Sequence, residues 1–187
     1  MDDFSGSTAG LSRRNLLRFP ALLGVSQRRQ VIWADDSRGK PFSKDPSVVR
    51  YQGRYLLYYS LMPRQDDPLR AWGIGIAESR DLMEWRKAGE IRPEGELEQK
   101  GICAPGVLRL DGRLHMFYQT YGGGAKDSIC HAHSEDGLKW RRDQTNPVFR
   151  ASGEWNCGRV IDADVIVHKG TLLMLGATRD PGYKTQM

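Results

Sequence analysis

Two aspartates, more than a hundred positions apart, occupy the same place in a repeated sequence phrase. Asp45 stands eight residues before Gly53, and Asp162 stands eight residues before Gly170. Two carboxylates around one cavity can perform acid and base chemistry on an acetal, because one can be ionised while the other is protonated at the same pH. Taken singly, an aspartate before a proline, such as Asp45 before Pro46, more often starts a turn. Their shared place in the repeat favours a functional role.

The repeated phrase occurs three times. The copies are DPSVVRYQGRYLLYYS (45–60), APGVLRLDGRLHMFYQ (104–119) and DADVIVHKGTLLMLGA (162–177), and their turn glycines, Gly53, Gly112 and Gly170, are 59 and 58 residues apart. Each copy consists of an apolar strand, a tight turn and a second apolar strand. Glycine at the second turn position is typical of a hairpin with positive φ angles.

A second phrase follows the first two copies. Its copies are GIAESRDLMEW (75–85) and CHAHSEDGLKW (130–140), and Ser79 and Trp85 precede Ser134 and Trp140 by 55 residues. Together the two phrases indicate four short strands per unit, which is typical of a β-propeller blade. The alternative, unrelated hairpins in a β-sandwich, requires both matches to be coincidences.

The predicted fold class is therefore all-β, a propeller of which the chain contains about two and a half blades. We expect residues 1–40 to form an export signal-like or disordered segment and residues 41–187 to form the partial propeller. The blades are expected near 44–98, 101–150 and 159–187. A propeller typically closes with four to eight blades, so the sequence reads as the N-terminal fragment of a larger protein. An open sheet edge would make the isolated chain prone to aggregate or oligomerise.

Composition excludes several classes of protein. The chain has 187 residues with 39% hydrophobic content, and it contains no run of 18 apolar residues that would predict a membrane-spanning helix. Of the net charge of +5, residues 1–40 carry +3, from seven Arg or Lys and four Asp, which leaves +2 for the remaining chain. Because the propeller region is nearly balanced, nucleic acid is not an expected partner.

The basic cluster near the start predicts export. Two arginines in SRRNLLR (12–18) precede the apolar stretch FPALLGV (19–25), which resembles a twin-arginine signal and predicts a periplasmic or secreted protein. The apolar stretch is short and no A-x-A cleavage site follows it. An ordinary basic amphipathic or disordered start is the alternative.

The three copies of the first phrase resemble the inner strands of five-bladed propeller glycosidases, above all glycoside hydrolase family 43, with families 32, 62 and 117 as relatives. SKDPSVVRYQGRYLLYYS is similar to the family's first-blade Asp-Pro motif, and VIDADVIVHKGTLLML to its third-blade Ile-Asp-Pro motif. ICAPGVLRLDGRLHMFYQ is similar to the second-blade motif, with Cys103 and Gly106 replacing a Trp and an Asp. Lys44 stands where family 32 normally has Asn, which favours family 43 or 117.

The resemblance implies the roles of the two aspartates. Asp45 matches the general base, which activates a water for attack at the anomeric carbon with inversion, and Asp162 matches the residue that modulates the pKa of the acid. Family 32 would instead make Asp45 a nucleophile. The general-acid glutamate has no counterpart here, since the available glutamates are expected on the surface: Glu78, Glu90, Glu94, Glu96, Glu98 and Glu154. The chain by itself is therefore expected to be inactive.

Sugar binding calls for flat apolar faces and short polar groups near the mouth of the channel. The candidates are Trp33, Phe42, Trp72, Trp155 and Arg159, and core packing is the alternative for each aromatic residue. No metal ligands are assigned and no cofactor is required, although the resemblance implies that calcium can occupy the channel. His131 and His133 alternate on one strand face, which suits either a metal or solvent. The three cysteines are expected to be buried as small apolar residues.

The predicted function is that of a glycoside hydrolase which, in its complete form, cleaves an O-glycosyl bond in a polysaccharide or oligosaccharide. Its expected partners are that substrate and the remaining blades of the full-length chain, with neither nucleic acid nor membrane. A non-catalytic glycan-binding propeller is the alternative. A protein-interaction propeller is disfavoured, because the repeats of such propellers are about 40 to 45 residues long, whereas the turn glycines here are 59 and 58 residues apart.

Overall fold

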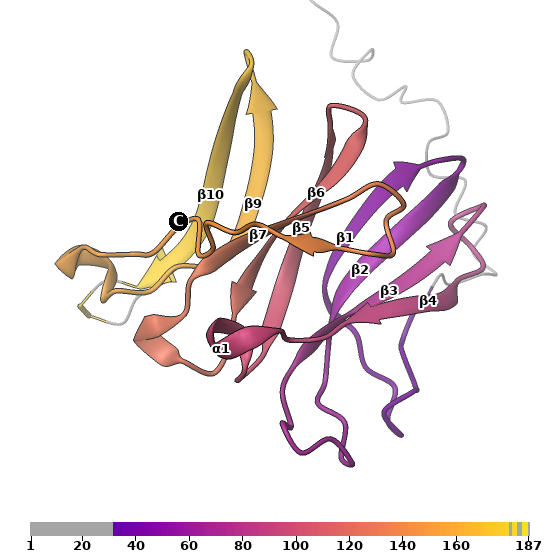
Figure 1. Ribbon diagram of the computed structural model, residues 1–187, viewed down its shortest axis with the longest axis horizontal. Coiled ribbons are helices and arrows are strands. Elements are labelled where there is room, and N and C mark those ends of the chain that lie inside the picture. Colours follow the sequence, from indigo (N-terminus) through magenta and orange to yellow (C-terminus); the bar gives the residue numbers. More distant parts are fainter. Residues whose placement is uncertain (1–31, 180, 183–184, 187) are drawn as a thin grey trace, which may run out of the picture. The chain divides into compact units, whose positions relative to one another are not determined.

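Three antiparallel sheets, each built from consecutive strands, make up the described part of the chain (Figure 1). The computed structural model describes residues 32–179, 181–182 and 185–186, so the predicted export signal at 12–25 lies outside the described residues. The first sheet contains β1 (Lys44–Tyr51), β2 (Arg54–Leu61), β3 (Gly73–Ser79) and β4 (Arg86–Ile91). The second contains β5 (Ile102–Leu110), β6 (Arg113–Thr120), β7 (Ile129–Ser134) and β8 (Arg141–Arg142). The third contains β9 (Ile161–His168), β10 (Thr171–Arg179) and β11 (Thr185–Gln186).

The helical elements are short and connect or flank the sheets. They are α1 (Gly95–Glu98), η1 (Gly124–Lys126) and η2 (Glu154–Asn156). No helix of the described residues has the length and apolar character needed to cross a membrane.

The sheets are arranged as blades around a common hub. The first strand of each sheet lies innermost, with β1 beside β5 and β5 beside β9, and later strands follow outward in sequence order. Figure 1 shows the three inner hairpins pointing the same way. The prediction of an all-β propeller fold with about two and a half blades is confirmed.

The inner hairpins have the turn that their sequences predict. Two residues connect β1 to β2, and both have positive φ, 48° at Gln52 and 77° at Gly53. Asp111–Gly112 and Lys169–Gly170 have nearly the same angles. This geometry matches the right-handed twist of the flanking strands, and glycine adopts it without steric cost.

Apolar side chains between the blades form the core. The first and second blades bury Leu56, Tyr58 and Ile76 against Leu114 and Met116. A smaller cluster between the second and third blades includes Ile129, Val160 and Ala163. Each large apolar side chain removed from water in this way contributes about 1.5 to 3 kcal/mol, so each blade is stabilised by its neighbour.

The segment from Trp33 to Phe42 covers the other face of the first blade. The Trp33 ring packs edge-on against Tyr59, with centroids 6.0 Å apart. Asp35 is buried, accepts a hydrogen bond of 2.6 Å from the Tyr59 hydroxyl and forms an ion pair of 2.9 Å with Lys87. Burial acts to raise the pKa of Asp35, but hydrogen bonds from Ser37, Tyr59 and Lys87 outweigh it and lower the pKa to about 2.

The third blade leaves apolar side chains open to solvent. Ile166 of β9 and Leu173 of β10 are cross-strand partners, and they are 48% and 43% exposed. Leu175, two residues further along β10, is 59% exposed. The side chains on this face are of the type that packs between blades elsewhere in the fold.

Two glutamates expected on the surface are instead buried, which corrects the sequence interpretation. Glu98 is 2% exposed; it accepts hydrogen bonds from the Tyr118 hydroxyl (2.5 Å) and pairs with Arg142 (3.0 Å). Glu78 is 9% exposed and pairs with Arg54 and Arg86. Both carboxylates are held by arginines and are part of the scaffold.

We expect Glu98→Ala to reduce the free energy of unfolding by about 3 kcal/mol, because it leaves Arg142 without its buried partner. Glu96→Ala, on the exposed side of the same short helix, should change stability by less than about 0.5 kcal/mol. Urea unfolding followed by tryptophan fluorescence measures both. Equal effects of the two substitutions would contradict a structural role for Glu98.

Candidate active site

A β-bulge begins the inner strand of every blade. Opposite Tyr59 of β2 the first strand places two residues, Asp45 and Pro46, where regular pairing would place one. The second blade repeats the bulge at Ala104–Pro105, and the third repeats it at Asp162–Ala163. Asp45, Ala104 and Asp162 have φ of 54°, 49° and 53°.

The bulge explains why these positions matter. Left-handed backbone costs an L-residue roughly 1 to 2 kcal/mol, with Asp among the residues that adopt it most readily. Bulges redirect a side chain away from the regular face of a sheet. The three positions that the repeat aligns therefore share one backbone conformation, and two of them carry a carboxylate.

The Asp45 carboxylate is held by two groups. The Ser60 hydroxyl donates a hydrogen bond of 2.7 Å to Oδ2, and the Lys44 ammonium lies 3.5 Å from the same oxygen. Ser60 is fully buried and also accepts a hydrogen bond of 2.8 Å from the Ala104 backbone N–H. The carboxylate of the first blade is thus connected to the backbone of the second.

Asp162 has a different environment. Its backbone N–H donates a hydrogen bond of 2.8 Å to Gln119 Oε1, and no side chain in the described part of the chain donates to its carboxylate. Desolvation by neighbouring groups raises the pKa of Asp162, the negative charge of Asp45 raises it further, and Lys44 and Arg159 act in the opposite direction. Asp45 and Asp162 are therefore close enough to repel each other.

The charges of both carboxylates affect the pKa of the buried Cys103 thiol. Burial is the main cause that raises its pKa to about 12, and the charges of Asp45 and Asp162 add to the shift. The two aspartates and Cys103 thus lie at the same end of the hub.

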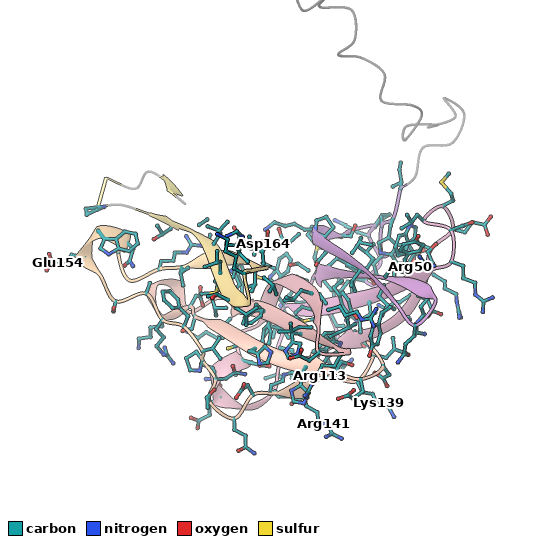
Figure 2. The ribbon with its side chains drawn as sticks, turned by 90° about the horizontal axis from the view of Figure 1, so that it is seen from above. Arg50, Arg113, Lys139, Arg141, Glu154 and Asp164 are labelled. Atoms are coloured by element: carbon teal, nitrogen blue, oxygen red, sulfur yellow. The ribbon has the colours of Figure 1, made fainter. Side chains whose placement is uncertain are left out.

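The labelled side chains show the two sides of the blade assembly. Figure 2 shows Arg50 of β1 and Asp164 of β9 on one side of the blades, and Arg113, Lys139 and Arg141 of the second blade on the other.

An aromatic cluster lies at the end of the blades where Asp45 is found. The Phe42 and Trp72 rings are 5.6 Å apart, and the Trp72 and Tyr121 rings are 5.5 Å apart. Phe42 precedes β1, Trp72 precedes β3 and Tyr121 follows β6, so all three lie at the strand ends near the bulges. Phe42 and Trp72 are two of the predicted sugar-binding residues, whereas Tyr121 was not predicted, and its one signal in the sequence is its place directly after a repeated strand.

The other predicted sugar-binding residues do not join this cluster. Trp33 packs with Leu57 and Tyr59 on the outer face of the first blade. Trp155 lies on η2 and is 63% exposed. Arg159 precedes β9, and its charge lowers the pKa of Asp162, so it lies near the carboxylates.

The histidines form a chain on the second blade. His115 Nδ1 lies 3.0 Å from His131 Nε2, and His131 Nδ1 lies 3.1 Å from Asp143 Oδ2. Within residues 32–179, no group of three or more His, Cys, Asp or Glu side chains is arranged to hold a metal ion, and calcium in the channel stays a prediction. Cys103 and Cys130 are buried as expected, but Cys157 is exposed, because it ends η2 in a loop.

Radial four-stranded blades with paired carboxylates at one end of the hub are typical of the propeller-type glycoside hydrolases. The sequence model of the family described as Glycosyl hydrolases family 32 N-terminal domain matches residues 40–186. The chain therefore belongs to glycosyl hydrolase family 32, as an N-terminal domain of that family. The narrower preference for family 43 or 117, which rested on Lys44, is not confirmed by this match.

Two proteins of Mycobacterium tuberculosis, the uncharacterized proteins MT1551 and Rv1502, are similar in sequence. Each is 28% identical over 147 residues, an alignment that covers 72% of this chain and 46% of the relative. The chain thus spans less than half the length of these relatives.

Solved structures of three glycoside hydrolase families share the fold. Zg3597, a family 117 glycoside hydrolase of Zobellia galactanivorans, has a TM-score of 0.66 at 19% identity, over 84% of this chain and 54% of that one. Fructan 1-exohydrolase IIa of Cichorium intybus has a TM-score of 0.64 at 19% identity, over 74% and 28%. A thermostable family-43 glycoside hydrolase has a TM-score of 0.62 at 21% identity, over 75% and 51%. At these identities the similarity concerns the fold alone.

We expect Asp45→Asn to lower the pKa of Asp162, because the substitution removes a negative charge that disfavours the second carboxylate. A ¹³C NMR titration of the carboxyl carbons measures the change. Asp111→Asn, in the hairpin turn at the opposite end of the second blade, is the matched control and should leave the Asp162 titration unchanged. An unchanged titration in Asp45→Asn would show that the two groups are not coupled.

Proposed function

We propose that this chain forms the first blades of a glycosidase that hydrolyses an O-glycosyl bond in a polysaccharide or oligosaccharide. The observation that carries the proposal is the pair Asp45 and Asp162, which occupy the same bulged position of two blades and lie near enough for the charge of Asp45 to raise the pKa of Asp162. Their environments differ, since one carboxylate accepts a hydroxyl hydrogen bond and the other has a raised pKa. Unequal carboxylates in one site are what acetal hydrolysis requires.

Asp45 is proposed as the carboxylate that acts at the anomeric carbon. Membership in family 32 favours direct attack by Asp45 as a nucleophile, with net retention, over activation of a water with inversion, as the family 43 resemblance implies. The contacts with Ser60 and Lys44 leave Oδ1 of Asp45 free of the hydrogen bonds and ion pair that hold Oδ2. NMR of the first-formed sugar distinguishes the two routes by its anomeric configuration.

Asp162 is proposed to orient the substrate and to modulate the pKa of the acid. Because the carboxylate is repelled by Asp45 and partly desolvated, it gains from any donor that a bound ligand supplies. Sugar hydroxyls are such donors. Phe42, Trp72 and Tyr121 offer apolar ring faces at the same end of the blades, and Arg159 adds a cation whose charge acts on Asp162.

The general acid is proposed to come from further blades of a longer polypeptide. Two of the six glutamates considered as acids, Glu78 and Glu98, are paired with arginines in the scaffold. The apolar face of β9 and β10 offers a packing surface for a following blade, and the curated relatives are about twice as long as the matched region. Export through the basic segment at 12–25 is proposed on the sequence alone.

We expect Asp45→Asn, in the longest natural polypeptide that contains this sequence, to lower kcat on aryl glycosides and oligosaccharides by about 10²-fold to 10⁴-fold. The neutral amide lacks the charge needed at the anomeric carbon. Asp111→Asn, which removes an aspartate in the hairpin turn at the opposite end of the second blade, serves as the control and should keep full activity. Turnover at the wild-type rate in Asp45→Asn would remove that residue from the mechanism.

Glycan binding without cleavage is the second candidate function. The observation that favours it is that Glu78 and Glu98 are engaged in ion pairs within the described residues, so neither is a free acid for the hub. A wild-type polypeptide that binds oligosaccharides in calorimetry but releases no reducing sugar would establish this alternative.

A further inference from the structure

Ser60 joins two blades through a single hydroxyl group. The residue is 0% exposed, near the end of β2, and its Oγ lies 2.7 Å from Asp45 Oδ2 and 2.8 Å from the Ala104 amide nitrogen. Asp45 belongs to the first blade, whereas Ala104 belongs to the second. One buried oxygen therefore contacts both bulges.

The second bulge makes the Ala104 amide available for this contact. Pairing of β5 with β6 jumps from Cys103 to Gly106, so the N–H of Ala104 is released from the regular ladder. A buried backbone N–H needs an acceptor. Ser60 Oγ provides it, which means that the amide occupies a lone pair of the hydroxyl and restricts its rotation.

The direction of the hydroxyl proton follows from this geometry. A serine hydroxyl has one proton to donate and two lone pairs to accept with. The Ala104 amide has no role except as donor, so Ser60 must accept from it and direct its own proton to Asp45. Amide, hydroxyl and carboxylate form a chain in which each hydrogen bond strengthens the next.

The interface between the second and third blades has a similar hydrogen bond from a bulge amide to a side chain of the preceding blade, but that side chain does not contact a carboxylate. Gln119 is the residue of β6 that pairs with Cys103, as Ser60 of β2 pairs with Lys44. Its Oε1 accepts the Asp162 N–H at 2.8 Å. The corresponding residue of the third blade, Ala177, pairs with Ile161 and has no polar group, so the third blade cannot hold its own aspartate as the first blade does.

We propose that Ser60 is a positioning residue that fixes the Asp45 carboxylate for reaction and does so only when the second blade is docked. This inference deepens the proposed function, on which it rests. Ser60 is fully buried, and it acts by holding Oδ2 of Asp45 and thereby orienting the other oxygen. Packing between the first two blades is coupled in this way to the geometry of the reacting group.

The test compares two serines in the longest natural polypeptide that contains this sequence. Ser60→Ala removes the hydrogen bond to Asp45, whereas Ser47→Ala removes an inter-blade hydrogen bond of 3.0 Å from the Val107 amide that does not involve Asp45. We expect Ser60→Ala to lower kcat by about 10-fold to 100-fold with little change in KM, because a misplaced reacting group loses rate steeply. Ser47→Ala should keep the wild-type kcat.

Rescue by a conservative variant separates positioning from loss of packing. Ser60→Thr, which keeps the hydroxyl, should restore kcat.

The outcomes separate this inference from the proposed function. If Asp45→Asn abolishes turnover while Ser60→Ala retains the wild-type kcat, Ser60 has no positioning role. If Asp45→Asn is fully active, the proposed role of Asp45 fails instead, and a wild-type polypeptide without turnover would overturn the glycosidase proposal itself. In that case an NMR titration tests only the hydrogen-bond chain from Ala104 through Ser60 to Asp45. Protonation of Asp45 should shift the amide resonance of Ala104 and leave that of Val107 in place.

The same NMR titration, carried out on the wild type, covers the case in which Ser60→Ala does not fold. A shift of the Ala104 amide with the titration of Asp45, retained in Ser60→Thr, supports the chain of hydrogen bonds. An Ala104 amide resonance that does not change as Asp45 titrates would overturn the proposed chain of hydrogen bonds.

Discussion

The left-handed bulge at the start of each inner strand is the feature on which the site depends. It places an extra residue in β1, β5 and β9 at the same distance from the hairpin turn. The backbone strain of three non-glycine residues with φ near 50° is sustained because the surrounding sheets leave no alternative path. Where the strained residue is an aspartate, the bulge turns its carboxylate toward the hub. Where it is Ala104, the same bulge supplies a backbone donor.

Contacts between blades then convert these bulges into one site. Ser60 reaches the second blade and Gln119 reaches the third, each by accepting the amide hydrogen of the next strained residue. The backbones also approach closely, since a Cβ atom added at Gly106 would lie 2.6 Å from the carbonyl oxygen of Ala163. A side chain at position 106 would therefore require β9 to shift away from β5.

Much of the fold could be predicted from the sequence because its signals are local and repeat. Glycine at the second hairpin position and alternating apolar residues specify the inner hairpins, and the spacing of their copies indicates the blades. The common position of Asp45 and Asp162 followed from the same alignment. The bulge was not foreseen, although proline or alanine after the strained residue, as at Pro46 and Pro105, is its one local trace, since a proline lacks the N–H that a ladder needs.

Residues whose role depends on distant partners could not be identified in this way. Glu98 lies in a polar segment that is typical of a surface, and only the arrival of Tyr118 and Arg142 from the next blade makes it a buried anchor. Ser60 stands in an apolar strand and resembles a small core residue until the Ala104 amide is placed beside it. Trp33 likewise owes its packing on Tyr59 to a partner from another strand, and its predicted role in sugar binding stays a prediction.

The unequal treatment of the two carboxylates follows from these distant contacts. Ser60, one residue before the end of β2, can hold Asp45, whereas the corresponding residue of β10, Ala177, has no polar side-chain group to offer Asp162. The repeat therefore supplies two copies of one backbone position, and a single side chain on the neighbouring strand makes them chemically different. Asp45 is held by a donor before any ligand arrives, while Asp162 has a raised pKa and keeps its oxygens open to one. The blades repeat one backbone, but the residue that pairs with the start of the inner strand differs between them, Ser60 in the first blade and Ala177 in the third, and this difference makes the site asymmetrical.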